Sequence, residues 1–430
     1  MRYRFAKKLP LFLSLAIGCL FLGCSNSEGV DQEIIANWNI AEDATPLSSK
    51  IDYLPLDDSE YPYAGLPRIV IETENHREIK DRETEIPAKL QVWGEKSPES
   101  EVMDLTIRGR GNSTWNYPKK PYAIKFNEKQ SFLDMPKAKK WVMLANYKDR
   151  TLIRNAVAFE LARHTSLKWT PSGKFADVFL NGKFLGNYYI CEKIEVKKNR
   201  LEQSDKSFLL EFDSHYDEEF KFRTKYNDFP VNIKFPSEPD SSQIHYIKNY
   251  VDSAEYALQQ DPNDTSYLAY INQKSFADFF LVNELTTNTE MSHPKSIFIH
   301  KEHDEKIEAG PVWDFDYDTF NINKNGLTNK NTIFFKQFWQ KKSFRKVFYD
   351  QWILNKIQFI AIEHFIDSLS TYIDKSNQVN AELWPIHKAK YNVGDETKSF
   401  PEAIEMLKKS LTKKANELDS LLDSQQKGLQ

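Results

Sequence analysis

Cysteine is scarce in this 430-residue chain, which contains three: Cys19, Cys24 and Cys191. Cys19 lies within an apolar N-terminal stretch and Cys24 lies at its end, so Cys191 is the one cysteine of the remaining chain. A disulfide within that body is therefore excluded, because a disulfide needs two cysteines. Cysteine and histidine residues also do not cluster at the spacing of zinc ligands, which excludes a site of that kind.

The chain also lacks an excess of positive charge. It has 58 Lys and Arg against 62 Asp and Glu, a net charge of −4. Such a balance disfavours binding to a phosphate backbone, so we predict no nucleic-acid partner. Beyond the N-terminal stretch, the sequence has no apolar run of the roughly 20 residues that a membrane span requires.

The first 24 residues have the order of a lipoprotein signal peptide. Four cations within the first eight residues precede an apolar stretch, residues 9–22, which is too short to span a bilayer. A small residue, Gly23, then precedes Cys24. We predict a signal peptide over 1–23, cleavage before Cys24 and lipid on its thiol. Two or more acyl chains would hold the protein on the cell envelope, at the outer membrane.

The rest of the chain divides into four predicted stretches. Residues 24–60 are polar and acidic, as in a tether. Short β-rich runs dominate 61–240, and Asn181-Gly182 predicts a hairpin there. Apolar residues recur every three or four positions in 241–400 and again in 401–430, which predicts helices. The expected fold class is α+β, with a β-rich N-terminal lobe and a mainly helical C-terminal lobe.

Two shorter elements are predicted within these lobes. Asp149 is suited to cap a helix over 150–164 that interrupts the strands. In the helical lobe, strands are expected over 297–300 and 311–313, on either side of a charged turn.

A glycine turn and a strand lysine form the first candidate site. Residues 107–114 read I-R-G-R-G-N-S-T, in which the glycines let backbone N–H groups approach an anion and Arg108 adds donors. The alternative is a hairpin turn with a basic rim. Lys125 ends the strand Y-A-I-K, 14 residues after Gly111, where it would place a fixed cation. The alternative is a lysine that protects a strand edge.

Acidic residues form the second candidate site. Residues 310–316 read G-P-V-W-D-F-D, so Asp314 and Asp316 face the same way on an extended segment. Adjacent carboxylates repel unless a cation joins them, and Mg²⁺ with phosphate oxygens is the expected guest. The alternative is a surface turn with paired aspartates. Glu290, near the end of a predicted helix, is placed to accept the proton of a substrate hydroxyl.

Together these segments resemble the spore coat protein H (CotH) kinase family. The resemblance is carried by I-R-G-R-G-N-S-T-W-N-Y-P-K-K-P-Y-A-I-K (107–125), W-V-M-L-A-N-Y-K-D-R-T-L-I-R-N (141–155), G-N-Y-Y-I-C-E-K-I-E-V (186–196) and G-P-V-W-D-F-D (310–316). It implies an atypical protein-kinase-like fold of two lobes that binds ATP with Mg²⁺ between them. It also implies transfer of the γ-phosphoryl group to serine or threonine of an exported or surface protein.

The resemblance further implies roles for individual residues. Catalysis would fall on Glu290, Lys125 and Asp314, and the metal on Asp314 and Asp316. Nucleotide-binding roles would fall on seven residues: Arg108, Asn112, Ser113, Lys120, Lys125, Glu160 and Glu192. Glu160 would form an ion pair with Lys125. Many members have aspartate where this chain has Glu290, and a carboxylate displaced by about 1 Å can cost on the order of 100-fold in rate.

Two other functions are compatible with the sequence. A catalytically weak or inactive kinase-like protein could bind a protein or carbohydrate at the cell surface through aromatics such as Trp115 and Tyr117. Hydrolysis of glycosides by the carboxylates is disfavoured, because the lysine-rich strand has no role in that chemistry. Convergence of Lys125, Glu290 and Asp314 on one cleft would favour the kinase over the binding protein.

Overall fold

The computed structural model describes residues 51, 53, 56–385, 393–395 and 397–427, which belong to one compact unit, Lys50–Gln430. The predicted signal peptide, the lipidation site Cys24 and most of the predicted tether lie outside the described residues. Among the residues described, no helix is both long enough and apolar enough to cross a membrane.

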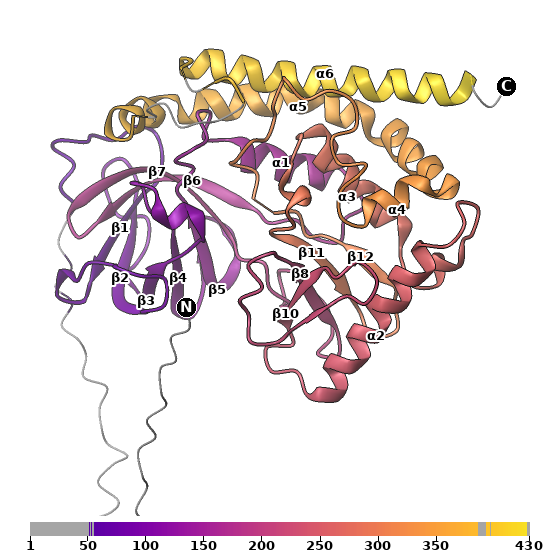
Figure 1. The fold of residues 1–430 in the computed structure, drawn as a ribbon. Helices are drawn as coiled ribbons and strands as arrows, with labels where there is room; N and C mark the ends of the chain where they lie inside the picture. Colours follow the sequence, from indigo (N-terminus) through magenta and orange to yellow (C-terminus); the bar gives the residue numbers. More distant parts are fainter. Residues whose placement is uncertain (1–50, 52, 54–55, 386–392, 396, 428–430) are drawn as a thin grey trace, which may run out of the picture. The chain divides into compact units, whose positions relative to one another are not determined.

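The N-terminal part of the described chain closes into a seven-stranded barrel with the strand order β1-β2-β3-β4-β5-β7-β6 (Figure 1). All neighbours are antiparallel except β1 and β6, whose parallel pairing closes the barrel. Buried residues alternate along β2, as expected of a strand with one face in a core. The strands are β1 (Arg68–Thr73), β2 (Ile86–Trp93), β3 (Met103–Gly109), β4 (Tyr122–Phe132), β5 (Met135–Leu144), β6 (Gly173–Leu180) and β7 (Lys183–Glu192).

A two-residue turn joins β6 to β7. Leu180 pairs with Lys183, and the two residues between them, Asn181 and Gly182, have φ angles of 51° and 72°. Positive φ at both positions matches the twist of the flanking strands, which is why Asn-Gly is favoured there. The predicted hairpin is confirmed.

A second sheet of five strands has the order β12-β11-β8-β10-β9. One face packs apolar side chains such as Leu210 and Ile299 into the main core. The predicted boundary between 61–240 and 241–400 falls between β10 and α2, and it would separate β8 from β11, which are hydrogen-bonded in this sheet. The strands are β8 (Phe208–Phe212), β9 (Lys221–Arg223), β10 (Pro230–Phe235), β11 (Ile297–Lys301) and β12 (Ile307–Ala309).

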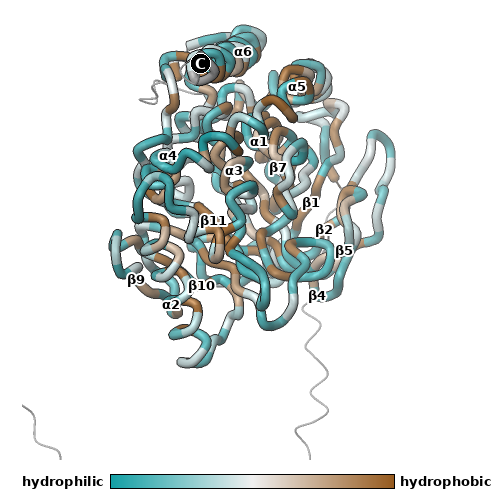
Figure 2. Tube along the Cα trace, turned by 90° about the vertical axis from the view of Figure 1, so that its right-hand side faces the viewer, coloured by the Kyte–Doolittle hydropathy of each residue, from teal (hydrophilic) through white to brown (hydrophobic). Residues whose placement is uncertain are grey.

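The C-terminal part is mainly helical, and its hydrophobic segments gather around α3 and β11 (Figure 2). The mixed α+β architecture with a β-rich N-terminal region is therefore the one predicted. The α-helices are α1 (Arg154–Arg163), α2 (Ser241–Leu258), α3 (Gln273–Leu285), α4 (Phe335–Gln340), α5 (Lys342–Leu383) and α6 (Phe400–Lys427). Short 3-10 turns cover Glu74–His76, Ser113–Asn116, Ser266–Ala269 and Glu290–Ser292.

Two local predictions were wrong. Helix α1 begins at Arg154 rather than at residue 150, because Asp149 closes an irregular turn first. The Asp149 carboxylate accepts the N–H of Thr151 (2.8 Å) and of Arg154 (2.9 Å), and Leu152 between them has φ of 61°. The strand expected over 311–313 is absent from the described residues, since β11 pairs with β12 (Ile307–Ala309), just before Pro311.

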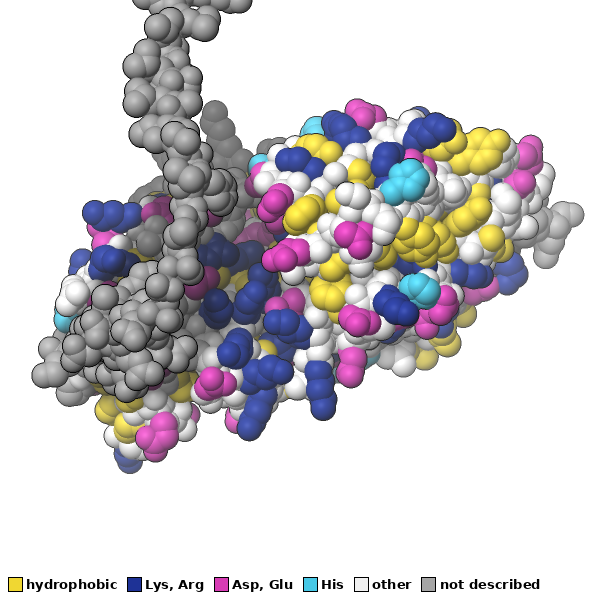
Figure 3. Space-filling model, turned by 90° about the horizontal axis from the view of Figure 1, so that it is seen from below, with side chains coloured by type: hydrophobic (Ala, Val, Ile, Leu, Met, Phe, Trp, Pro, Cys, Tyr) yellow, Lys and Arg dark blue, Asp and Glu magenta, His cyan; other side chains and the backbone are white. Residues whose placement is uncertain are grey.

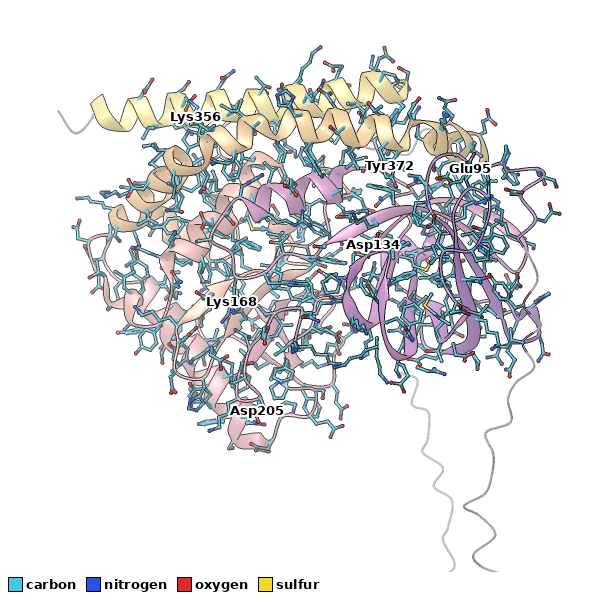
Figure 4. The ribbon with its side chains drawn as sticks, turned by 180° about the vertical axis from the view of Figure 1, so that it is seen from behind. Glu95, Asp134, Lys168, Asp205, Lys356 and Tyr372 are labelled. Atoms are coloured by element: carbon cyan, nitrogen blue, oxygen red, sulfur yellow. The ribbon has the colours of Figure 1, made fainter. Side chains whose placement is uncertain are left out.

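Helix α5 contacts the barrel as well as the helical part. It packs on α1, α3, α4 and α6 and on strand β7, and it runs beside α6 (Figure 1). Lys356 of α5 lies near α6 (Figure 4), with Nζ 2.6 Å from Asp419 Oδ2. Near its other end, Asn380 Oδ1 accepts from the buried Lys119 amine (2.8 Å) and from the Asn187 N–H (3.1 Å). Because buried polar groups need partners, these bonds fix α5 to the barrel.

Candidate functional site

A cleft of about 740 Å³ lies between the outer face of the barrel and the second sheet. Its walls come from β3, β4 and β5 on one side and from β8, β10 and β11 on the other, and residues 313–317 contribute to its lining. Seven of the predicted site residues line it: Arg108, Asn112, Ser113, Lys125, Glu290, Asp314 and Asp316. Lys125, Glu290 and Asp314 thus converge on one cleft.

The glycine turn contributes backbone donors to this cleft. Gly111 has φ of +82°, and Arg82 holds the turn by donating to the Gly111 carbonyl (2.9 Å) and to Asn112 Oδ1 (2.8 Å). Within the described residues, the backbone N–H groups of Gly111, Asn112 and Ser113 have no backbone acceptor. A turn that presents N–H groups in this way suits an anion.

Gly109 is required by the close packing of this turn. A Cβ there would lie 2.5 Å from the Trp115 ring and 2.6 Å from the Asp81 carbonyl oxygen. We expect Gly109→Ala to lower the free energy of unfolding by about 1–3 kcal/mol, because overpacking against backbone strains the fold. Chemical denaturation would measure this. Gly94→Ala is the matched control, since its Cβ would meet the flexible Glu99 side chain; an equal loss in both variants would contradict the expectation.

The lysine strand lies at the rim of the cleft. The Lys125 side chain is 49% exposed, and its Nζ lies 3.6 Å from Glu85 Oε2. The expected ion pair between Lys125 and Glu160 does not form. Glu160 lies on α1, where its carboxylate is 2.6 Å from Arg163 and 3.5 Å from His164.

Lys120 and Glu192 do not line the cleft either. Lys120 donates to the Trp115 carbonyl (2.6 Å) and lies over the Trp115 ring. Glu192 is buried, forms an ion pair with Arg200 and accepts the Ser172 N–H (2.8 Å). Local pairing therefore draws both side chains away from the positions that the family resemblance implied.

Asp314 and Asp316 lie side by side in the cleft. Their carboxyl groups are hydrogen-bonded, and burial, followed by the charge of Asp314, raises the pKa of Asp316 well above its usual value. Asp314 has φ of 58°, and the Phe315 N–H between them donates to Asn155 Oδ1 (2.9 Å). Helix α1 thus fixes the turn through Asn155. Two adjacent carboxyl groups are a donor set that suits a divalent cation, whose charge would relieve their repulsion.

Metal binding here would need help from a ligand. Within the described residues, no three histidine, cysteine, aspartate or glutamate side chains group closely enough to hold a metal ion. Mg²⁺ commonly takes one or two carboxylates and completes its shell with phosphate oxygens and water. The pair Asp314 and Asp316 fits that pattern.

Glu290 lies at the start of a 3-10 turn after α3. Its N–H donates to Asn288 Oδ1 (3.0 Å), and Asn288 Nδ2 donates to Asn283 Oδ1 (3.0 Å), so the turn is held from the end of the helix. Burial, then the charge of Asp314, raises the pKa of Glu290 to about 7, while Lys295 opposes the shift. A carboxylate with this pKa can take up a proton near neutral pH.

The aromatics expected on the surface lie elsewhere. Trp115 packs under Gly109 and against Tyr122, so it offers no exposed platform. Tyr117 lines the cleft and stacks on Tyr147, with ring centroids 5.7 Å apart. The arrangement gives no particular support to a carbohydrate surface at these residues.

Several cleft residues were missed by sequence reasoning. Arg110 lies over the Trp313 ring, and its positive charge partly opposes the rise in the pKa of Asp316. Its position two residues after Arg108 was a usable signal, because alternate residues of a strand share a face. The others come from distant segments and carried no local signal: Lys140, Lys193, Glu211, Asp213 and Lys234.

Comparison with known proteins identifies the family of this chain. The model of the family described as CotH kinase protein matches residues 107–418, or 312 of the 430 residues. No curated protein matches the chain. The matched range contains the glycine turn, Lys125, Glu290 and both aspartates of the cleft. Since the family model covers well over half of the sequence, the chain belongs to the CotH kinase family.

Proposed function

We propose that this protein is a two-lobed, lipid-anchored kinase that transfers the γ-phosphoryl group of ATP to serine or threonine of exported or surface proteins. Membership of a kinase family implies kinase activity and the use of a nucleotide. The observation that carries the proposal is the convergence of Glu290, Asp314, Asp316 and the glycine turn on one cleft.

Different residues of the cleft would bind the phosphates, the metal ion and the base of the nucleotide. The N–H groups of the glycine turn, with Arg108 and Arg110, would bind phosphate oxygens. Asp314 and Asp316 would hold Mg²⁺, which supplies charge neutralisation to the phosphates when bound. Apolar side chains suited to contact a base line the same cleft: Ala123, Val142, Leu144, Ile194, Phe298 and Trp313.

Glu290 is the proposed proton acceptor. As the acceptor hydroxyl oxygen bonds to the γ-phosphorus, the bond from that phosphorus to the β–γ bridging oxygen breaks and ADP leaves. The hydroxyl proton passes to the Glu290 carboxylate, whose pKa of about 7 suits the transfer. Incubation of the purified protein with γ-labelled ATP, Mg²⁺ and envelope proteins tests this, and calorimetry tests binding. If no labelled product forms and calorimetry detects no nucleotide binding, the proposal is refuted.

The membrane anchor is part of the proposal and rests on the sequence around Cys24. Cells expressing the protein should incorporate labelled palmitate into it, and Cys24→Ser should abolish the label because the thiol at the predicted cleavage site is lost. The wild-type protein should sediment with outer membranes, as a dually or triply acylated protein does. A labelled Cys24→Ser protein would contradict the assignment.

A further inference from the structure

Cations from two different sheets meet in the middle of the cleft. Arg108 on β3, Lys140 on β5 and Lys193 just after β7 line the barrel side, and Lys234 on β10 lines the other side. Their proximity shows in Lys193: burial, then the charges of Lys140, Lys234 and Arg108, lower its pKa to about 8 against the opposing effect of Glu195. Gathering these charges is unfavourable unless an anion joins them.

In the part of the chain that the structure describes, the amines of two lysines on the barrel side make no close polar contact. Among the described residues, neither Lys140 nor Lys193 forms an ion pair or a hydrogen bond through its amine. Lys140 also lies directly opposite Lys125 in the β4–β5 ladder, and like charges at facing positions destabilise a sheet. Figure 3 shows such a gathering of Lys and Arg side chains near the middle of the face seen from below.

The lysine on the opposite wall is aimed by a local irregularity. Ile233 pairs with Leu210 and Phe235 pairs with Leu209, so Lys234 is the extra residue of a β-bulge. Bulges redirect side chains and are frequent beside active sites. The Lys234 amine is 3.2 Å from Glu211 and also pairs with Glu218, which keeps it protonated. The bulge thus sets a permanent positive charge across from Lys140 and Lys193.

We infer that Lys140, Lys193 and Lys234, with Arg108, bind a polyphosphate chain without needing a divalent cation. Four cations on two facing walls complement a ligand that carries several negative charges. The chain can come from the nucleotide or from inorganic polyphosphate. The inference rests on the proposed function only if the nucleotide is the source.

The test is calorimetric titration of the full-length protein with tripolyphosphate in EDTA. Wild type should bind, Lys140→Met/Lys193→Met should bind at least about tenfold more weakly, and Asp314→Asn should bind no more weakly than wild type. Lys129→Met/Lys137→Met removes the same charge from exposed residues of the same hairpin and is the matched control. No binding by wild type, or equal binding by both double variants, would overturn the inference.

Two further measurements keep the result interpretable. Lys140→Arg/Lys193→Arg retains the charge and should retain binding, whereas its failure to bind would contradict charge as the cause. Competition by metal-free ATP would identify the nucleotide as the source, and additive binding would identify inorganic polyphosphate; both support the site. If the wild-type protein binds tripolyphosphate but does not turn over ATP, the result counts against the proposed function and supports this inference.

The site also has a pH signature. Lys193, with its pKa near 8, is charged at pH 7 and largely neutral at pH 9, so the affinity for sulfate, whose own charge is constant there, should fall over this range. Glu211, whose pKa burial raises to about 7, adds negative charge on the same rise. The difference between wild type and Lys193→Met isolates the lysine, and identical pH profiles would contradict its role.

Discussion

Replacing Asp314 with asparagine should reduce phosphoryl transfer by on the order of 100-fold or more, because the cleft loses half of the charge that would hold Mg²⁺. Asparagine has nearly the same volume and tolerates the positive φ of 58° at this position, so the turn should persist. Transfer from γ-labelled ATP at saturating Mg²⁺ measures the effect.

The same substitution should not destabilise the protein. The charge of Asp314 is the largest cause, after burial, of the raised pKa of Asp316, so its removal relieves a repulsion. We therefore expect an unchanged or higher melting temperature together with the lost activity. Asp134→Asn is the matched control, since Asp134 is an exposed aspartate with φ of 61° outside the cleft. Full activity of Asp314→Asn would exclude the metal assignment.

Glu290→Gln should lower kcat by roughly 100-fold to 10,000-fold while nucleotide affinity changes little, because general base catalysis is typically worth that much. Glutamine keeps the shape of the side chain and the N–H bond to Asn288 but cannot take the proton. Glu305→Gln, at a side chain outside the cleft, serves as the control. A parallel loss of nucleotide affinity would point to a binding role instead.

The pH dependence of the wild type offers a second reading of Glu290. A base with a pKa of about 7 is mostly protonated at pH 6 and mostly ionised at pH 8, so kcat should rise over that interval. A cation at Asp314 neutralises the second cause of the shift and moves the rise to lower pH. Glu290→Asp should keep the rise but with a lower maximum, since its carboxylate is withdrawn by one methylene.

Local sequence signals accounted for the elements whose stability is local. The Asn181-Gly182 turn and the alternating strands of the barrel follow from the preferred conformation and burial of each residue. These features depend on neighbours within a few residues, which a sequence displays directly. Asp314 and Asp316 were also expected to share the cleft, but they do so on a turn, with φ of 58° at Asp314, and not on the extended segment that their spacing predicted.

Features that depend on distant partners could not be predicted. Glu160 was expected beside Lys125, but Arg163 lies one helical turn away on the same face and pairs with it first. Lys234 enters the cleft because β10 has a bulge where it pairs with β8. The residues on either side of Lys234 do not predict this bulge. The parallel pairing of β1 with β6 joins segments about 110 residues apart in the chain, which local patterns do not reveal.

The buried contacts between α5 and the barrel limit how ligands can enter and leave the cleft. A wide swing of one wall away from the other would break the buried bonds of Lys119 and Asn380 or unseat α5 from α1 and α3. Ligand exchange at the cleft would then depend on small segments that line it, chiefly the glycine turn and the stretch around His215. A 3.3 Å contact between Asn112 and His215 connects these two segments. In the proposed kinase, the catalytic groups would be assembled before the substrate arrives.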